Sequence, residues 1–345
     1  MVNLLTQQPR LNIMGILMCL FLSQLIGCSA MFSKNRTKFN WLATESAPKY
    51  FTMRVLSGNL HYHKAEGGLY IPEAASIGRY WGTGESTHVV GDTYKPLPDR
   101  LTIQFFSFWE NTLYQGDFEL PYEHILAQFK AGVAATEKGR ATYNRIMVGI
   151  APGGAVAVWL SGRETREVFF GQAQPYEADI ENAIGSPITN RAEYAQSYLD
   201  KLPSEFVQNI KKNGIPFGIW NEYRKHYTWA VDIQKAGTPK DIGYGFFNGE
   251  SYRLEYPIEQ QLVEQKMPIP ALIKFWATEL VTGERHLYIV HFNYNELREK
   301  FDQLSNTGKV IRFEFTPKFP KRNTLIRLTN GDESIDLKHF NVEEW

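Results

Sequence analysis

The sequence predicts an α+β protein of two similar lobes, each a mostly antiparallel sheet with one main helix, joined by a helical connector. Two observations predict this class. Stretches of alternating apolar and polar residues, typical of strands, occur in pairs separated by short polar turns. Each of two such groups also contains one amphipathic segment at helical spacing, and a helix with one apolar stripe needs a sheet face to cover.

The first pair of strands in each lobe shows an internal similarity. "LPDRLTIQFFSFWE" (97–110) resembles "MPIPALIKFWATEL" (267–280), with isoleucine and phenylalanine matched at one constant offset. Each stretch precedes a polar turn and a second strand, at 113–120 and at 285–292. Upstream, "FNWLA" around Trp41 is similar to "YTWAV" around Trp229. We therefore predict two copies of one unit; the alternative is a chance similarity between two ordinary α+β segments.

A helix and a second hairpin follow in both copies. The apolar faces of the two helices are predicted from Ile125, Leu126 and Phe129 in the first copy and from Leu297, Phe301 and Leu304 in the second. The hairpins are predicted at 145–162 and at 310–331. In the first of these, Pro152 and Gly153 occupy the second and third positions of "APGG", which is typical of a type II turn.

The segment between the two copies differs from both. Tyr194, Tyr198 and Leu199 have helical spacing, Pro203 interrupts it, and a second short helix ends before Gly214. The sequence therefore predicts five parts: a signal peptide at 1–27, a lipidated tether at 28–39, a first α+β lobe at 40–170, a helical connector at 171–226 and a second α+β lobe at 227–345.

The N-terminal residues predict a lipid anchor at Cys28. Arg10 precedes an uncharged apolar run, residues 11–27, which is too short and too interrupted for a stable membrane span and is typical of a signal peptide. The run ends in Leu25-Ile26-Gly27-Cys28, which resembles the lipobox of bacterial lipoproteins, in which the cysteine thiol is acylated. Ser29 follows, and in that resemblance a residue other than Asp indicates the outer membrane. The alternative is a buried core helix with an incidental cysteine.

Composition limits the remaining possibilities. The only other cysteine, Cys19, lies within the signal, so no disulfide is expected and stability must come from an apolar core. The charges balance, with 37 Lys and Arg against 37 Asp and Glu, which argues against nucleic acid as a partner. Three cations at positions 34, 36 and 38 follow the anchor and favour a solvated tether or contact with anionic headgroups.

No motif predicts a catalytic site, a metal or a cofactor. The sequence has no G-x-S-x-G and no phosphate-binding loop. His61 and His63 would share one strand face, but a polar, solvent-facing strand explains them better than a metal site. His286 and His291 would lie on opposite faces of their strand. The aromatic run from Phe105 to Trp109 is compatible with a ligand pocket, although core packing is the default.

Several of these stretches together resemble one family. They are "YWGTG", "FFSFWENTLYQGDFELP", "VGIAPGGAVAVWLSG" and "GIWNEYRKHYTW". They are similar to the bacterial lipoproteins of the domain of unknown function number 2931, over most of the chain from about Trp41 onward. That family has no assigned catalytic residues, so the resemblance implies none here. Some such lipoproteins are immunity partners of secreted phospholipase toxins.

The hypothesis that follows is a protein held at the outer membrane by a lipid on Cys28, facing the periplasm and acting by binding. Its protein partner would be a phospholipase toxin, contacted by an exposed hairpin turn near Asn111, Gly153 or Gly283. The alternatives are an anchored envelope enzyme of unknown reaction and a structural component of the envelope.

Overall fold

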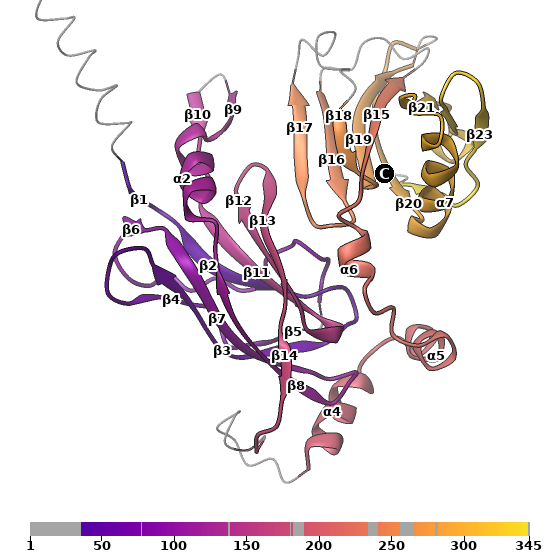
Figure 1. Ribbon diagram of the computed structural model, residues 1–345. Helices are drawn as coiled ribbons and strands as arrows, with labels where there is room; N and C mark the ends of the chain where they lie inside the picture. Colours follow the sequence, from indigo (N-terminus) through magenta and orange to yellow (C-terminus); the bar gives the residue numbers. More distant parts are fainter. Residues whose placement is uncertain are drawn as a thin grey trace, which may run out of the picture.

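In the computed structural model, the chain forms an α+β protein whose strands pair mainly in antiparallel fashion (Figure 1). The structure describes residues 36–76, 78–136, 139–179, 181, 190–233, 241–255, 265–279 and 282–343. Cys28 and the predicted signal peptide therefore lie outside the described residues. Among those that are described, no helix combines the length and the apolar character needed to cross a membrane.

The first lobe packs one main helix and two groups of strands around its own apolar core. Its strands are β1 (Lys38–Phe39), β2 (Leu42–Ser46), β3 (Met53–Tyr62), β4 (Gly68–Tyr70), β5 (Ala75–Ser76), β6 (Lys95–Pro96), β7 (Pro98–Ser107), β8 (Thr112–Glu119), β9 (Val133–Thr136), β10 (Gly139–Ala141), β11 (Arg145–Ala151), β12 (Ala155–Ser161), β13 (Thr165–Gln172) and β14 (Gln174–Tyr176). The helix α2 (Tyr122–Ala131) buries Ile125, Leu126 and Phe129, as its sequence predicts.

The second lobe has a separate core and a similar order of elements. Its strands are β15 (His226–Ile233), β16 (Asp241–Phe246), β17 (Ser251–Glu255), β18 (Gln265–Pro268), β19 (Pro270–Thr278), β20 (Arg285–Phe292), β21 (Ile311–Thr316), β22 (Leu325–Thr329), β23 (Ser334–Asp336) and β24 (Phe340–Val342). The helix α7 (Tyr294–Ser305) buries Leu297, Phe301 and Leu304. Asn293 caps it, accepting a hydrogen bond from the backbone N–H of Glu296.

Corresponding elements of the two lobes pair in the same way. In both, a strand near the start runs parallel to the first strand of the last hairpin, β2 with β11 and β15 with β21. The indole of Trp41 donates to the carbonyl of Pro96 at 3.2 Å, and the indole of Trp229 donates to the carbonyl of Pro268 at 3.1 Å. Two tryptophans that look alike in the sequence therefore make the same kind of hydrogen bond, from the indole to a proline carbonyl.

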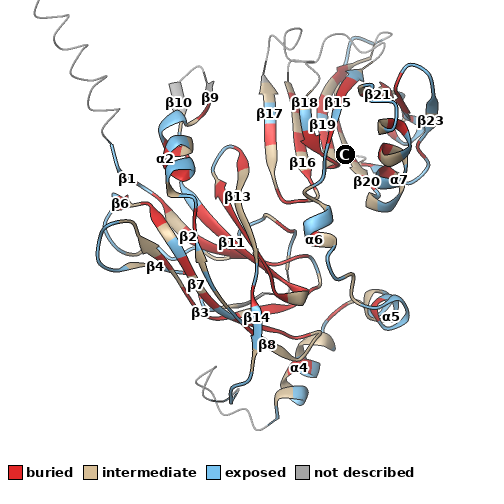
Figure 2. Cartoon of the chain, viewed as in Figure 1, coloured by how far each residue is buried: buried red, intermediate tan, exposed pale blue. Residues whose placement is uncertain are grey.

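The connector is helical, in agreement with its sequence pattern. It contains α4 (Arg191–Leu199), α5 (Ser204–Asn213) and the short α6 (Ile219–Glu222). Gly214 ends α5 with a φ of 79°, a conformation that favours glycine. One strand, β14, lies inside the range predicted for the connector and pairs with β8 of the first lobe. Most residues of helix α5 are exposed (Figure 2), while Ile210 is buried.

The two lobes join through a shared sheet. A nine-stranded sheet has the order β2-β11-β12-β13-β17-β16-β19-β20-β24, so it passes from one lobe into the other between β13 and β17. That crossing rests on one strand bridge, Thr165 with Ser251. The indole of Trp159 reinforces it by donating to the carbonyl of Asn248 at 3.1 Å. Strand pairing and a buried indole together make the two lobes one body.

Candidate functional site

Two of the three turns predicted to contact a partner meet at one place in the structure. Glu110, in the turn between β7 and β8, accepts hydrogen bonds from the Tyr114 hydroxyl at 2.7 Å and from the Gly153 N–H at 3.0 and 3.1 Å. Burial, together with this bond to Glu110, raises the pKa of Tyr114. Gly153 has φ 77° and ψ 8°, as a type II turn requires. The two turns are therefore tied together by one carboxylate.

The connector covers this junction. The indole of Trp220 on α6 donates to the carbonyl of Pro152 at 3.2 Å. Phe206 on α5 packs its ring 5.4 Å from Phe51 and 6.0 Å from Trp109. The turns at Asn111 and Gly153 are consequently half-buried and fixed, whereas Gly283, in the turn between β19 and β20, is exposed. Of the three residues, Gly283 alone is exposed.

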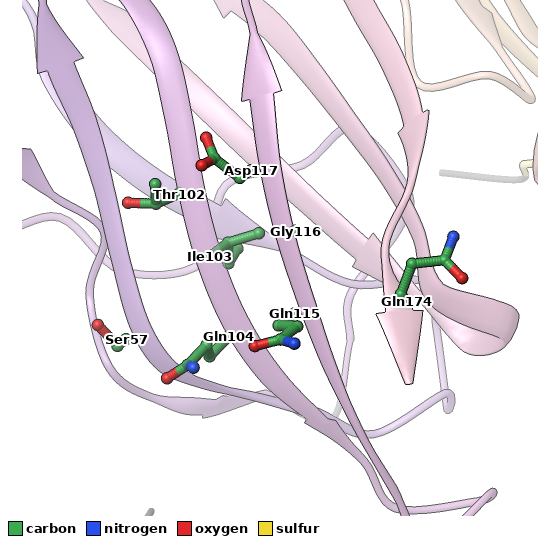
Figure 3. Close-up of a pocket in the computed structure, with 8 residues that line it drawn as sticks. All are labelled: Ser57, Thr102, Ile103, Gln104, Gln115, Gly116, Asp117 and Gln174. Carbon is green, nitrogen blue, oxygen red and sulfur yellow. The ribbon is translucent and has the colours of Figure 1, made fainter. Parts of the chain in front are cut away.

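A polar surface lies on the outward side of the sheet formed by β14, β8, β7, β3 and β4 (Figure 3). Ser57, Gln104, Gln115 and Gln174 stand opposite one another on four neighbouring strands, because Ser57 pairs with Gln104, Gln104 with Gln115 and Gln115 with Gln174. We call this row, with Thr102 and Asp117 beside it, the polar face. It borders a shallow groove of about 440 Å³.

Strand alternation produces the polar face. Ile103 and Phe105 point into the apolar core of the first lobe, so the residues between and beside them point outward. The four side chains of the row are exposed. Within the described chain, the amides of Gln104, Gln115 and Gln174 have no hydrogen-bond partner. The row therefore presents hydrogen-bond donors and acceptors on a rigid sheet.

The margin of the polar face carries charged and polar side chains that already have hydrogen-bond partners. Arg100 donates to Asp117 at 2.6 Å, and this hydrogen bond holds the pKa of the Asp117 carboxyl below its usual range. His61 lies 2.8 Å from the Thr102 hydroxyl. His63 lies beyond the end of β3, 2.6 Å from Asp99 and stacked on Tyr122. The two histidines thus have separate polar partners.

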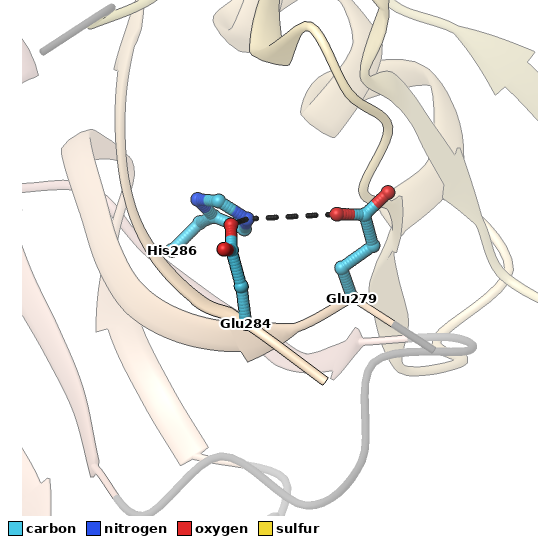
Figure 4. A group of neighbouring side chains, drawn as sticks. All are labelled: Glu279, Glu284 and His286. Carbon is cyan, nitrogen blue, oxygen red and sulfur yellow. Dashed lines mark ion pairs between the residues drawn. The ribbon is translucent and has the colours of Figure 1, made fainter. Parts of the chain in front are cut away.

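A third group of polar side chains lies at the turn between β19 and β20 (Figure 4). His286 and His291 fall on opposite faces of β20, as the sequence predicts, because His291 contacts Glu343 whereas His286 faces Glu279 and Glu284. This group was not predicted from the sequence. Its signal was a Glu-x-His pattern directly after a hairpin turn, with a further Glu at the end of the preceding strand.

The junction between the lobes also holds a buried carboxylate. Glu167 on β13 accepts a hydrogen bond from Arg224, while its own backbone N–H donates to Glu250 of the second lobe at 3.0 Å. Burial raises the pKa of Glu167 to about 7, although Arg224 opposes the shift. Its neighbours Glu250, Arg224 and Asn248 bond to one another or to this carboxyl, so the cluster holds the two lobes together.

The aromatic run from Phe105 to Trp109 belongs mainly to the core. Phe105, Phe106 and Phe108 are at most 1% exposed, and Phe108 packs against Tyr194 and Tyr198 of α4. This run therefore fills space between the sheet and the connector, as core packing predicts.

The family comparison agrees with the resemblance seen in the sequence. The model of the family described as "Protein of unknown function (DUF2931)" matches residues 29–218. The chain belongs to this family. The match covers the first lobe and most of the connector and ends before the second lobe, so it is shorter than the resemblance predicted. No curated protein and no solved structure matches the chain.

Proposed function

We propose that this member of the DUF2931 family is a lipid-anchored binding protein of the bacterial envelope, attached through Cys28, which neutralises a secreted phospholipase toxin. The observation that supports binding is the polar face. Its row of exposed side chains, Ser57, Gln104, Gln115 and Gln174, stands on four paired strands, and its amides have no hydrogen-bond partner among the described residues.

The chemistry of this row suits recognition of a protein surface. Amide and hydroxyl side chains donate and accept hydrogen bonds but do not titrate near neutral pH. Protein interfaces contain about ten direct hydrogen bonds and a similar number of bridging waters, so a polar, rigid surface is compatible with tight binding. The exposed turn around Gly283 is a second surface for contact, on the other lobe.

The proposed anchor adds proximity to the membrane. The described chain begins at Arg36, eight positions after Cys28. Because an extended chain spans at most about 3.5 Å per residue, these positions allow a separation of roughly 28 Å between the lipid and the first lobe. A binder held this close to a bilayer meets a lipid-degrading enzyme at high effective concentration, so a modest intrinsic affinity is enough.

The experiment measures complex formation between two purified proteins. The chain with Cys28→Ser is titrated by calorimetry into phospholipases secreted by bacteria of the same community, and their hydrolysis of phospholipid is recorded in parallel. We expect a one-to-one complex that inhibits hydrolysis by one of these enzymes. Gln115→Arg should weaken binding at least tenfold, about 1.4 kcal/mol, because it puts a bulky charge in the centre of the row.

The control is Gln208→Arg, which makes the same change at an exposed glutamine of α5 and should leave affinity unchanged. If no phospholipase is bound and the purified chain itself hydrolyses a lipid or peptidoglycan, the proposal is wrong and an anchored enzyme is the better interpretation. If Gln115→Arg binds as tightly as Gln208→Arg, the polar face is not the binding surface.

A further inference from the structure

The geometry points to a divalent metal site, of the kind that takes Zn²⁺, formed by Glu279, Glu284 and His286 at the turn between β19 and β20 (Figure 4). The three side chains come from both arms of one hairpin. Their donor atoms all lie within 4.8 Å of one another.

The hairpin itself brings the three donors together. Ala277 pairs with His286 across the two strands, and the Glu279 N–H donates to the Glu284 carbonyl at 2.8 Å, so the pairing continues toward the turn. Residues two apart on a strand share a face. Glu279 therefore lies on the face of Ala277, and Glu284 lies on the face of His286. The register of the hairpin alone brings the donors together, and no residue from a distant element takes part.

The spacing is close to that of a coordinated ion. The Nε2 of His286 lies 3.8 Å from Glu279 Oε2 and 3.9 Å from Glu284 Oε2. Zn²⁺ binds nitrogen and carboxylate oxygen at about 2.0–2.2 Å, which puts neighbouring ligands roughly 3.3 Å apart. The required contraction is of the order of half an ångström for these two distances. Glu284 can supply it, because its side chain is 72% exposed.

An independent observation concerns the imidazole. The Nε2 of His286 is buried and finds no hydrogen-bond partner among the residues that the structure describes. Burying such an atom without a partner costs free energy, and a bound metal ion would remove this cost. The ring of Phe319 lies 4.9 Å from the imidazole and holds it in place. The nitrogen is thus fixed, shielded and directed toward two carboxylates.

The supporting contacts orient the carboxylate and keep the neighbouring cation away. The Thr282 hydroxyl donates to Glu279 Oε2 at 2.8 Å, which orients this ligand. Arg285 lies between Glu284 and His286 in the chain, so its side chain is on the opposite face of the strand. Its guanidinium lies 5.2 Å from the centre of the Trp276 ring. One imidazole with two carboxylates favours zinc or a similar borderline ion over calcium, which prefers oxygen ligands alone.

The test uses the full-length chain with Cys19→Ser and Cys28→Ser, purified in detergent, so that no thiol competes. Equilibrium dialysis against Zn²⁺ followed by metal analysis should give one ion per chain. His286→Asn and Glu284→Ala should each weaken binding at least tenfold. Glu284 is exposed, so its variant should fold whatever happens to the histidine variant.

The matched control is His291→Asn, on the opposite face of the same strand, which should bind Zn²⁺ as the parent does. Co²⁺ gives a second readout, since its visible absorption should intensify on binding to the parent and to His291→Asn, and not to His286→Asn. Absence of stoichiometric Zn²⁺, or equal binding by Glu284→Ala and the parent, would overturn the proposal.

Discussion

Glu167 should make the stability of this protein fall between weakly acidic and neutral pH. Its side chain is 9% exposed, and one of its carboxylate oxygens, Oε2, is buried with no partner in the described part of the chain. Burial raises the pKa of Glu167 to about 7, and the nearby Glu250 adds to the shift, while Arg224 opposes it. The folded protein therefore keeps this carboxyl protonated at pH values where the unfolded chain has already ionised.

The magnitude follows from the two pKa values. The difference between the ordinary value of 4.5 and about 7 corresponds to about 3 kcal/mol of unfolding free energy. Because the folded state of Glu167 binds the proton more tightly, this contribution is fully present below pH 4.5. It is lost progressively as the pH rises through about 7.

The assay is urea denaturation at several pH values from 4.5 to 8, with the parent chain and Glu167→Gln compared. Glutamine cannot ionise. Over this pH interval the free energy of unfolding of the variant should therefore decline by about 3 kcal/mol less than that of the parent. The control Glu205→Gln removes an exposed carboxylate on α5 and should keep the decline. If Glu167→Gln and the parent have the same pH slope, Glu167 is ionised in the folded protein and the reasoning is wrong.

Three further predictions concern the anchor, the junction and the core. Cys28→Ser should abolish acylation and move the protein out of the membrane fraction; unchanged fractionation would contradict the lipid anchor. A chain ending after Phe170 should lack a cooperative thermal transition, because it loses the second lobe and the carbonyl that Trp159 bonds to; a cooperative melt would show that the first lobe is independent. Trp41→Phe should lower the free energy of unfolding by about 1–2 kcal/mol, measured in urea, because the bond to the Pro96 carbonyl is lost; an unchanged value would mean that this bond is not stabilising.

Most single elements could be predicted from the sequence, because their causes are local. Alternation predicts β7 and β19, the Pro152-Gly153 pair predicts its turn, and the interruption at Pro203 separates α4 from α5. The apolar faces of α2 and α7 also agree with their predicted residues. In each case the residues that determine the element are close neighbours in the chain.

The relations between distant segments could not be predicted. The bridge between Thr165 and Ser251 joins the lobes across 86 positions, and no periodicity reports such a pairing. The polar face likewise depends on register, since Gln115 must stand opposite both Gln104 and Gln174. The group around His286 differs from these, because its residues belong to one hairpin and strand alternation alone is enough to predict that they share a face.

Binding of an enzyme that attacks membranes, the function proposed above, can be measured on the membrane itself. Phospholipid vesicles carry the acylated protein, and fatty-acid release by a secreted phospholipase is followed as the protein-to-enzyme ratio rises. We expect release to stop near a one-to-one ratio, and we expect Cys28→Ser, free in solution, to need a higher concentration for the same protection. Undiminished release at every ratio, together with turnover of an envelope substrate by the protein alone, would contradict it.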